Sequence, residues 1–291
     1  MRFLRVGPSG AERPVLLADD RTTGYDLSEV TPEIDGAFLG RLLDGADDGL
    51  PAQLSALAGR GGLPRVELAG QRIGAPLARP GKVVCIGLNY RDHAAETGAD
   101  IPAEPVIFMK ASNTVVGPDD EVLIPRNSAR TDYEVELAVV IGRTARYLES
   151  PEAAPAVIAG YALSNDVSER EFQLERGGTW DKGKSCETFN PLGPWLVTAD
   201  EVGDVQRLGL RLAVNGESRQ QGSTADMIFD VRHVVWYLSQ FLVLEPGDVV
   251  NTGTPAGVAM GRESTPFLKP GDVMELEIDG LGRQRQRLGQ A

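Results

Sequence analysis

The 291-residue chain has few cysteines, few histidines and no long apolar run. Its two cysteines, Cys85 and Cys186, are too few for a disulfide framework and fit a reducing compartment. No stretch approaches the roughly 20 consecutive apolar residues that a membrane-spanning helix needs. The first residues include two arginines but no apolar segment after them, which is unlike a secretory signal. The sequence therefore predicts a cytoplasmic protein without a membrane partner.

Basic residues are also in short supply. The chain has 29 lysines and arginines against 42 aspartates and glutamates, a formal net charge of −13, and no stripe of basic residues. Such a chain repels phosphate backbones, so nucleic acid is excluded as an expected partner. An anionic substrate is not excluded, because a bound cation reverses the local potential. Hydrophobic residues make up 42% of the chain, enough for a substantial core.

The chain divides into two regions of different texture. Residues 1–76 are broken by Gly and Pro, begin with a strand-like segment and include a helix near Leu54. Residues 77–82 supply a Pro/Gly break at the junction. We therefore expect a small N-terminal domain (1–76) and a larger domain (77–291) that carries the chemistry.

The larger region is dominated by strand patterns. Five segments read as strands that end in Gly or Asn-Gly turns: 82–87, 134–142, 210–216, 248–253 and 272–280. Helical patterns are fewer, at 152–160 and 227–242. There is no βαβ alternation and no glycine-rich dinucleotide fingerprint. The fold class predicted is α+β, mainly antiparallel β.

One predicted strand carries two acidic residues on one face. Side chains alternate along residues 133–141, so the odd-numbered positions form an apolar face. Glu134 and Glu136 share the other face, about 6–7 Å apart at Cα. The rest of that face is apolar, and two like charges that are partly buried are unfavourable without a cation. Carboxylate oxygens suit Mg²⁺, Mn²⁺ or Ca²⁺; a solvated acidic edge strand is the alternative.

A third acidic residue favours the metal site. Asp166 ends an apolar strand about 30 residues downstream, and Arg170 and Gln173 follow it at helical spacing. A carboxylate, a cation and an amide that converge fit a site for an oxygen-rich anion. Alone, Asp166 would be read as a turn residue or helix N-cap.

At this point the chain resembles the fumarylacetoacetate hydrolase family. The matching stretches run from residue 82 to residue 282 and include CIGLNYRDHAAE, PVIFMK, DYEVELAVVIG, GYALSNDVSEREFQ, WDKGKSCETFNPLGPW and NTGTPAGVAMG. The resemblance implies a β-roll-like catalytic domain, a homodimer, and a Mg²⁺- or Mn²⁺-type ion. The ligands it implies are Glu134, Glu136 and Asp166.

The resemblance implies further roles, position by position. His93 and Glu96 match a catalytic pair on a loop that becomes a short helix, in which Glu96 orients the imidazole and His93 activates water. Lys184 matches an active-site lysine, although Lys182 lies two residues away. Asp92 remains open as a further metal ligand.

Three more positions match groups that bind substrate. Arg170, Gln173 and Thr254 are implied to face the 2-oxo acid, Thr254 at its carboxylate end. The second histidine of the chain, His233, lies on a predicted amphipathic helix and is interpreted as structural.

The implied reaction is hydrolysis of a carbon–carbon bond in a 2,4-diketo acid of the acylpyruvate type. Within the family the chain is most similar to bacterial hydrolases of 2,4-diketo-3-deoxy-L-fuconate or L-rhamnonate, which form pyruvate and L-lactate. The alternatives are an acylpyruvate hydrolase or oxaloacetate decarboxylase, a 2-hydroxyhepta-2,4-diene-1,7-dioate isomerase and a ureidoglycolate lyase. A metal-containing binding protein without catalysis is disfavoured, because His93 and Glu96 are both present.

Overall fold

The computed structural model describes residues 1–44, 48–262 and 264–291. One large sheet runs through both regions of the chain. Its strands, in spatial order, are β4 (Arg65–Glu67), β3 (Thr23–Asp26), β2 (Arg13–Leu17), β1 (Arg2–Val6), β15 (Leu196–Thr198), β12 (Ile158–Asn165), β11 (Val135–Ile141), β18 (Val249–Asn251), β6 (Val83–Gly87) and β7 (Val106–Lys110); β5 (Ile73–Gly74) also pairs with β1.

A five-stranded sheet forms a second layer. Its spatial order is β17 (Glu217–Ser223), β16 (Gly209–Val214), β19 (Val273–Ile278), β20 (Gly282–Gln290) and β9 (Val122–Ile124). Two short pairs complete the strands: β10 (Thr131–Asp132) with β13 (Ser168–Glu169), and β8 (Val115–Val116) with β14 (Asn190–Pro191). Most pairs are antiparallel; β18–β6, β20–β9 and β14–β8 are parallel. The predicted α+β class, mainly β, is confirmed.

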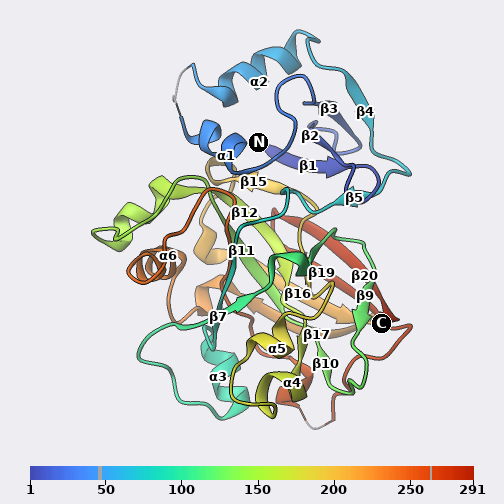
Figure 1. Ribbon diagram of the computed structural model, residues 1–291, viewed down its shortest axis with the longest axis vertical. Helices are drawn as coiled ribbons and strands as arrows, with labels where there is room; N and C mark the ends of the chain where they lie inside the picture. The colour runs from blue at the N-terminus through green and yellow to red at the C-terminus, as the bar shows by residue number, and fades with distance from the viewer. Residues whose placement is uncertain (45–47, 263) are drawn as a thin grey trace.

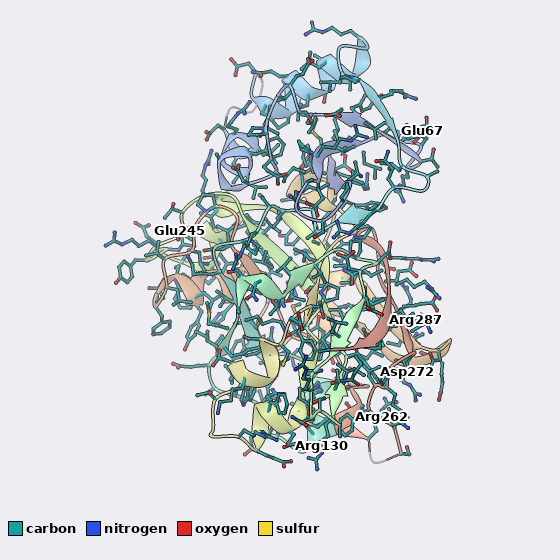
Figure 2. All side chains as sticks on the ribbon, turned by 45° about the vertical axis from the view of Figure 1, so that its right-hand side comes forward. Glu67, Arg130, Glu245, Arg262, Asp272 and Arg287 are labelled. Carbon is teal, nitrogen blue, oxygen red and sulfur yellow. The ribbon has the colours of Figure 1, made fainter. Side chains whose placement is uncertain are left out.

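The helices are short and lie around the sheets. They are α1 (Gly36–Leu43), α2 (Leu50–Gly59), α3 (Arg91–Thr97), α4 (Arg170–Leu174), α5 (Asp181–Lys184) and α6 (Val231–Ser239). Helices α3, α4 and α5 gather at the end of the molecule opposite the N-terminal strands (Figure 1). Glu67 and Arg262 mark these two ends (Figure 2). No helix in the described ranges is long and apolar enough to cross a bilayer.

The alternation predicted for residues 133–141 is confirmed by the two cores that β11 separates. Its odd-numbered side chains pack into the core between the sheets, where β11 contacts β16 and β19. Ala138 and Val140, on the other face, pack into the core beneath α1 and α2. Glu134, just before β11, and Glu136, its second residue, belong to that second face.

The two predicted helical segments of the larger region differ from the observed elements. Residues 152–160 do not form an α-helix: a 3₁₀ segment, η2 (Pro151–Val157), contains Pro155, which lacks the N–H that an α-helix needs, and β12 follows at once. The predicted helix at 227–242 is shorter, because Asp230 caps α6 and begins it four residues later.

The boundary between residues 76 and 77 stays a prediction. The N-terminal strands lie at the top of Figure 1 and continue the large sheet. Strand β1 pairs with β15 of the larger region. The two regions therefore share one sheet.

Candidate metal centre and active site

Three carboxylates meet where β11 and β12 begin and end. These strands pair antiparallel with Val135 opposite Asn165, so Glu134 and Asp166 come next to each other, and the N–H of Asp166 donates to the carbonyl of Glu134 (2.9 Å). Glu136 lies on the same face as Glu134. One oxygen from each carboxylate lies within 4.8 Å of the others, and all three residues are buried. Strand pairing thus assembles the predicted triad, and the solvated-strand alternative is wrong.

Three buried cations are joined to this cluster. Lys184 Nζ lies 2.8 Å from Glu134 and 3.0 Å from Asp166, and Lys110 Nζ lies 2.5 Å from Asp166. Arg170 Nη2 lies 2.7 Å from Glu134 Oε1 in an ion pair whose angle does not make a hydrogen bond. Two of the three carboxylates are therefore paired with cations.

Glu136 has no such partner. Within the described residues no lysine or arginine pairs with it; its Oε2 accepts a hydrogen bond from the N–H of Gly253 (2.8 Å). Burial, followed by the charges of Asp166 and Glu134, raises the pKa of Glu136 well above its usual value. Burial opposes ionisation of Glu134 too, but Lys184 and Arg170 lower its pKa to about 2. The centre therefore has one carboxyl group whose charge needs a further cation.

The donor set fits a hard divalent ion. All three groups that converge are carboxylates, without a thiolate or imidazole, which favours Mg²⁺ or Mn²⁺ over zinc. With Asp132, which pairs with Arg170, the connected network holds four carboxylates and three cations. A divalent ion would offset the excess negative charge and allow Glu136 to ionise.

Close backbone packing brings Lys184 to the centre. Helix α5 lies against α4 at Gly183, where an added Cβ would be 2.3 Å from the carbonyl oxygen of Glu169. A side chain at residue 183 would push the two short helices apart. Lys182, the other lysine considered, is exposed and donates to the carbonyl of Arg176. Of the two, Lys184 is the one in the site.

His93 and Glu96 lie on α3, close together but not hydrogen bonded. His93 Nδ1 is 3.8 Å from Glu96 Oε2 and has no hydrogen-bond partner among the described residues, although the side chain is buried. Glu96 accepts hydrogen bonds from the N–H of Gly257 (2.8 Å) and from Arg262 Nε (2.8 Å). Burial opposes ionisation of Glu96, but His93, Gly257 and Arg262 lower its pKa to about 2. An ionised Glu96 thus ties α3 to the loop that follows β18.

Asp132 joins this loop to the cations. Its Oδ2 lies 2.9 Å from Arg170 Nε and accepts from the N–H of Met260 (3.1 Å), while its Oδ1 accepts from the N–H of Ala259 (2.9 Å). The N–H of Tyr133 also donates to Oδ1 (2.9 Å), so a guanidinium and three backbone donors satisfy this fully buried carboxylate. Asp132 therefore fixes Arg170 and the turn η6 (Ala259–Gly261) in relation to each other.

The remaining predicted residues also lie in the site. Gln173 Oε1 accepts from Arg170 Nη1 (3.0 Å), as expected for two residues on one face of α4. Thr254 lines the same cavity, but its hydroxyl donates to the carbonyl of Val135 (2.9 Å) and accepts from Gln220 (2.8 Å). Its role at a substrate carboxylate stays a prediction, because its proton is used here within the protein.

The structure also places three residues whose roles the sequence left open or read as structural. Asp166 does not cap a helix; β13 intervenes, and Glu169 caps α4. Asp92 lies outside the carboxylate cluster and accepts from the N–H of His93. His233 packs between the aromatic rings of Phe229 and Tyr237, away from the cavity.

Lys110 and Asp132 are the residues that the sequence analysis missed. Lys110 ends β7 within the quoted PVIFMK stretch and is buried on the same side as Phe108. A lysine at the end of an apolar strand is one signal for it. The sequence signal for Asp132 is weaker, because the residues around it do not distinguish it from any other acidic residue that precedes a strand.

A cavity of about 200 Å³ opens onto the centre. It is lined by residues of the triad, by His93, and by three side chains of the predicted binding set, Arg170, Gln173 and Thr254, together with Lys184. The structure thus brings the predicted site residues around one space, and Glu96 and Asp166 lie directly behind it.

The family described as fumarylacetoacetate (FAA) hydrolase, C-terminal, matches residues 82–289. A protein of Burkholderia ambifaria, named as a hydrolase without a substrate, is 49% identical over 98% of both chains. The similarity to that relative extends over the N-terminal region as well.

Solved structures are also similar to this chain over its whole length. Fumarylacetoacetate hydrolase from Exiguobacterium antarcticum is 33% identical over the whole of both chains, with a TM-score of 0.84. Maleylpyruvate hydrolase from Sphingobium sp. SYK-6, solved with a manganese(II) ion and pyruvate, is 29% identical over the whole of both chains, with a TM-score of 0.79.

Proposed function

The chain belongs to the fumarylacetoacetate hydrolase family, and on this basis we propose that it is a divalent-metal-dependent hydrolase that cleaves the C3–C4 bond of 2,4-diketo acids. The observation that carries the proposal is the cavity in which His93 faces a buried carboxylate triad joined to Arg170 and Lys184. The triad of acidic groups would bind a metal ion, and the histidine would supply a base. The manganese and pyruvate bound by the Sphingobium enzyme support the metal and the 2-oxo acid end of the substrate.

The triad and its cations would hold the 2-oxo acid end of the substrate. Glu134, Glu136 and Asp166 would bind Mg²⁺ or Mn²⁺, which when bound supplies Lewis acidity to a chelating 2-oxo carboxylate. Arg170 and Gln173 line the cavity beside the triad and orient the carboxylate. Lys184 adds a buried ammonium where negative charge develops on the leaving pyruvate enolate.

His93 would act as the general base. It accepts a proton from a water that attacks the C4 carbonyl, and Glu96 stabilises the imidazolium. Collapse of the tetrahedral adduct breaks the C3–C4 bond, and its electron pair leaves with the pyruvate enolate. Return of the proton to C3 gives pyruvate and a carboxylic acid. The 3.8 Å between His93 and Glu96 would shorten when substrate closes the site.

The finer predictions belong to the same proposal. The substrate predicted from the sequence is a 2,4-diketo-3-deoxy sugar acid, L-rhamnonate or L-fuconate, which would give pyruvate and L-lactate. We also propose a cytoplasmic homodimer; size-exclusion chromatography with light scattering would give twice the chain mass of 31.2 kDa. Oxaloacetate decarboxylation, isomerisation of dienoic diacids and ureidoglycolate cleavage remain alternatives that product analysis separates.

The test is a metal-dependent assay for pyruvate. We expect chelated protein to be inactive on acetylpyruvate, and Mg²⁺ or Mn²⁺ to restore release of one pyruvate and one acetate per substrate. Activity that survives exhaustive chelation would contradict the metal. Absence of pyruvate from every 2,4-diketo acid in the presence of both ions would contradict the reaction.

A further inference from the structure

The cavity has two kinds of wall. Its charged and amide groups are those of the centre described above, and they are tied to one another by ion pairs and hydrogen bonds. Much of the remaining lining is apolar: Leu88, Ala99, Phe108, Leu174, Trp180 and Met260. A substrate whose 2-oxo acid end occupies the charged centre must place its other end against this apolar lining.

The apolar lining offers little to a polar group. Thr97, a hydroxyl residue beside it, donates to the carbonyl of His93 (2.9 Å). Among the described residues that line the cavity, the lysine and the arginine are Lys184 and Arg170, both already at the centre. A second carboxylate or a row of sugar hydroxyls would lose its water there without gaining matched partners.

Two aromatic rings form a continuous wall that starts at the centre. The ammonium of Lys184 lies 4.9 Å from the centroid of the Phe108 ring, and that ring lies 5.3 Å from the ring of Trp180, tilted by 58°. An acyl group attached to a 2-oxo acid at the centre would extend along Phe108 toward Trp180. Such faces bind alkyl and aryl groups well.

The backbone at residues 87 and 88 has two features that allow this aromatic wall to form. An added Cβ at Gly87 would lie 2.4 Å from Trp180 Cζ3, so the absence of a side chain lets the indole approach the strand. The next residue, Leu88, has a φ of +52°, which leucine rarely adopts, and its side chain lines the cavity. Retention of this conformation at a ligand wall fits a functional position.

We propose that this site selects 2,4-diketo acids with an uncharged, apolar acyl group, aryl or alkyl, over dicarboxylic and polyhydroxylated ones. The inference rests on the proposed function and specifies its substrate class. It favours the acylpyruvate alternative over the sugar acid predicted from the sequence. It also separates this chain from a hydrolase of the diacid maleylpyruvate. Trp180 and Phe108 are the specificity-determining residues.

The first test compares three substrates with the Mn²⁺-loaded full-length protein. We expect kcat/KM for benzoylpyruvate to exceed that for fumarylpyruvate and for a 2,4-diketo-3-deoxy sugar acid by at least about tenfold. Equal or higher kcat/KM for the diacid or the sugar acid would overturn this inference and leave the proposed hydrolase intact. Failure of all three substrates and of acetylpyruvate would instead overturn the proposed function.

The second test changes the wall. We expect Trp180→Ala to lower the ratio of kcat/KM for benzoylpyruvate to that for acetylpyruvate by about tenfold, since only the larger acyl group reaches the indole. Trp180→Arg should shift preference toward fumarylpyruvate, which keeps the inference testable if the alanine variant is unstable. Phe241→Ala, an exposed aromatic residue outside the cavity, is the matched control. Ratios unchanged from wild type in both Trp180 variants would contradict the assignment.

Discussion

Ion pairs hold together two parts of this chain, the N-terminal strands and the carboxylate centre, but the two sets differ in exposure and in charge balance. In the first, Arg72 bridges Asp120 (2.5 Å) and Glu12 (2.8 Å), and its side chain is 30% exposed. In the second, the side chains of Lys110 and Asp166 are fully buried. Each carboxylate of the first set (Glu12, Glu33 and Asp120) pairs with Arg5 or Arg72.

The buried set is incomplete by comparison. Four carboxylates meet three cations there, and Glu136 is left with a backbone N–H. Removing charges from water is costly unless they are matched, so a buried set with excess negative charge is a poor way to stabilise a fold. The same residue types therefore serve different ends: the N-terminal set joins two regions, and the central set is built to receive a cation and an anion.

The largest effect is expected from a substitution that leaves both ion-pair sets intact. His93→Ala should lower kcat for pyruvate release by about 10²–10⁴-fold, because the base that deprotonates water is lost. Mn²⁺ affinity should stay within a few-fold of wild type, since His93 is not in the triad. Steady-state kinetics and Mn²⁺ titration check the two halves. Full activity in this variant would reject the general base.

A smaller loss is expected where the buried set reaches the loop after β18. Asp132→Asn should reduce kcat/KM by about 10–100-fold, as for other residues that orient a ligand-binding group. Its amide cannot accept from Arg170 and from the N–H groups of Ala259 and Met260 together. If Asp132 only supports the fold, the melting temperature would fall while kcat/KM for acetylpyruvate stayed unchanged.

Glu96 gives a pH-dependent test at the edge of the site. Its pKa is lowered from 4.5 to about 2, so its contribution to stability is present above about pH 4.5 and is lost as pH falls toward 2. Glu96→Gln should therefore unfold more easily in urea than wild type at pH 6, and the difference should shrink on acidification. A difference that does not change with pH would contradict an ionised Glu96.

The smallest effect is expected in the partly exposed set. Arg72→Gln should lower the free energy of unfolding by less than about 1 kcal/mol, because solvent screens the pair with Asp120 and Arg5 still pairs with Glu12. Turnover should match wild type, since Arg72 lies outside the cavity. A drop in kcat comparable with that of Asp132→Asn would break the comparison between the two sets.

Local patterns in the sequence predict one part of this site well. The alternation along residues 133–141 places Glu134 and Glu136 on one face, and the structure confirms it. The same kind of reading fails at residues 152–160, where Pro155 prevents an α-helix. Periodicity indicates which face of an element is apolar. It does not account for the backbone N–H that Pro155 lacks and that an α-helix would need.

Pairings between distant segments are what the sequence does not reveal. Lys110 and Asp166 are 56 residues apart, and Asp132 meets Met260 across 128 residues. These contacts arise from the strand order β12–β11–β18–β6–β7, which no local pattern specifies. Family resemblance located the triad and Lys184, and spacing located Arg170, but the third cation, Lys110, became visible only in the fold.

The metal centre is tested most directly by measuring the binding of Mn²⁺ to metal-free protein. Calorimetry, or the loss of the electron paramagnetic resonance signal of the free ion, measures this binding. We predict one tight Mn²⁺ site per chain in wild type and in Glu12→Gln, and the loss of this site in Glu136→Gln. Glu12 is the matched control, because its carboxylate is buried but already paired with Arg5 and Arg72. Mn²⁺ binding that is absent from wild type, or equally tight in Glu136→Gln, would contradict the metal centre.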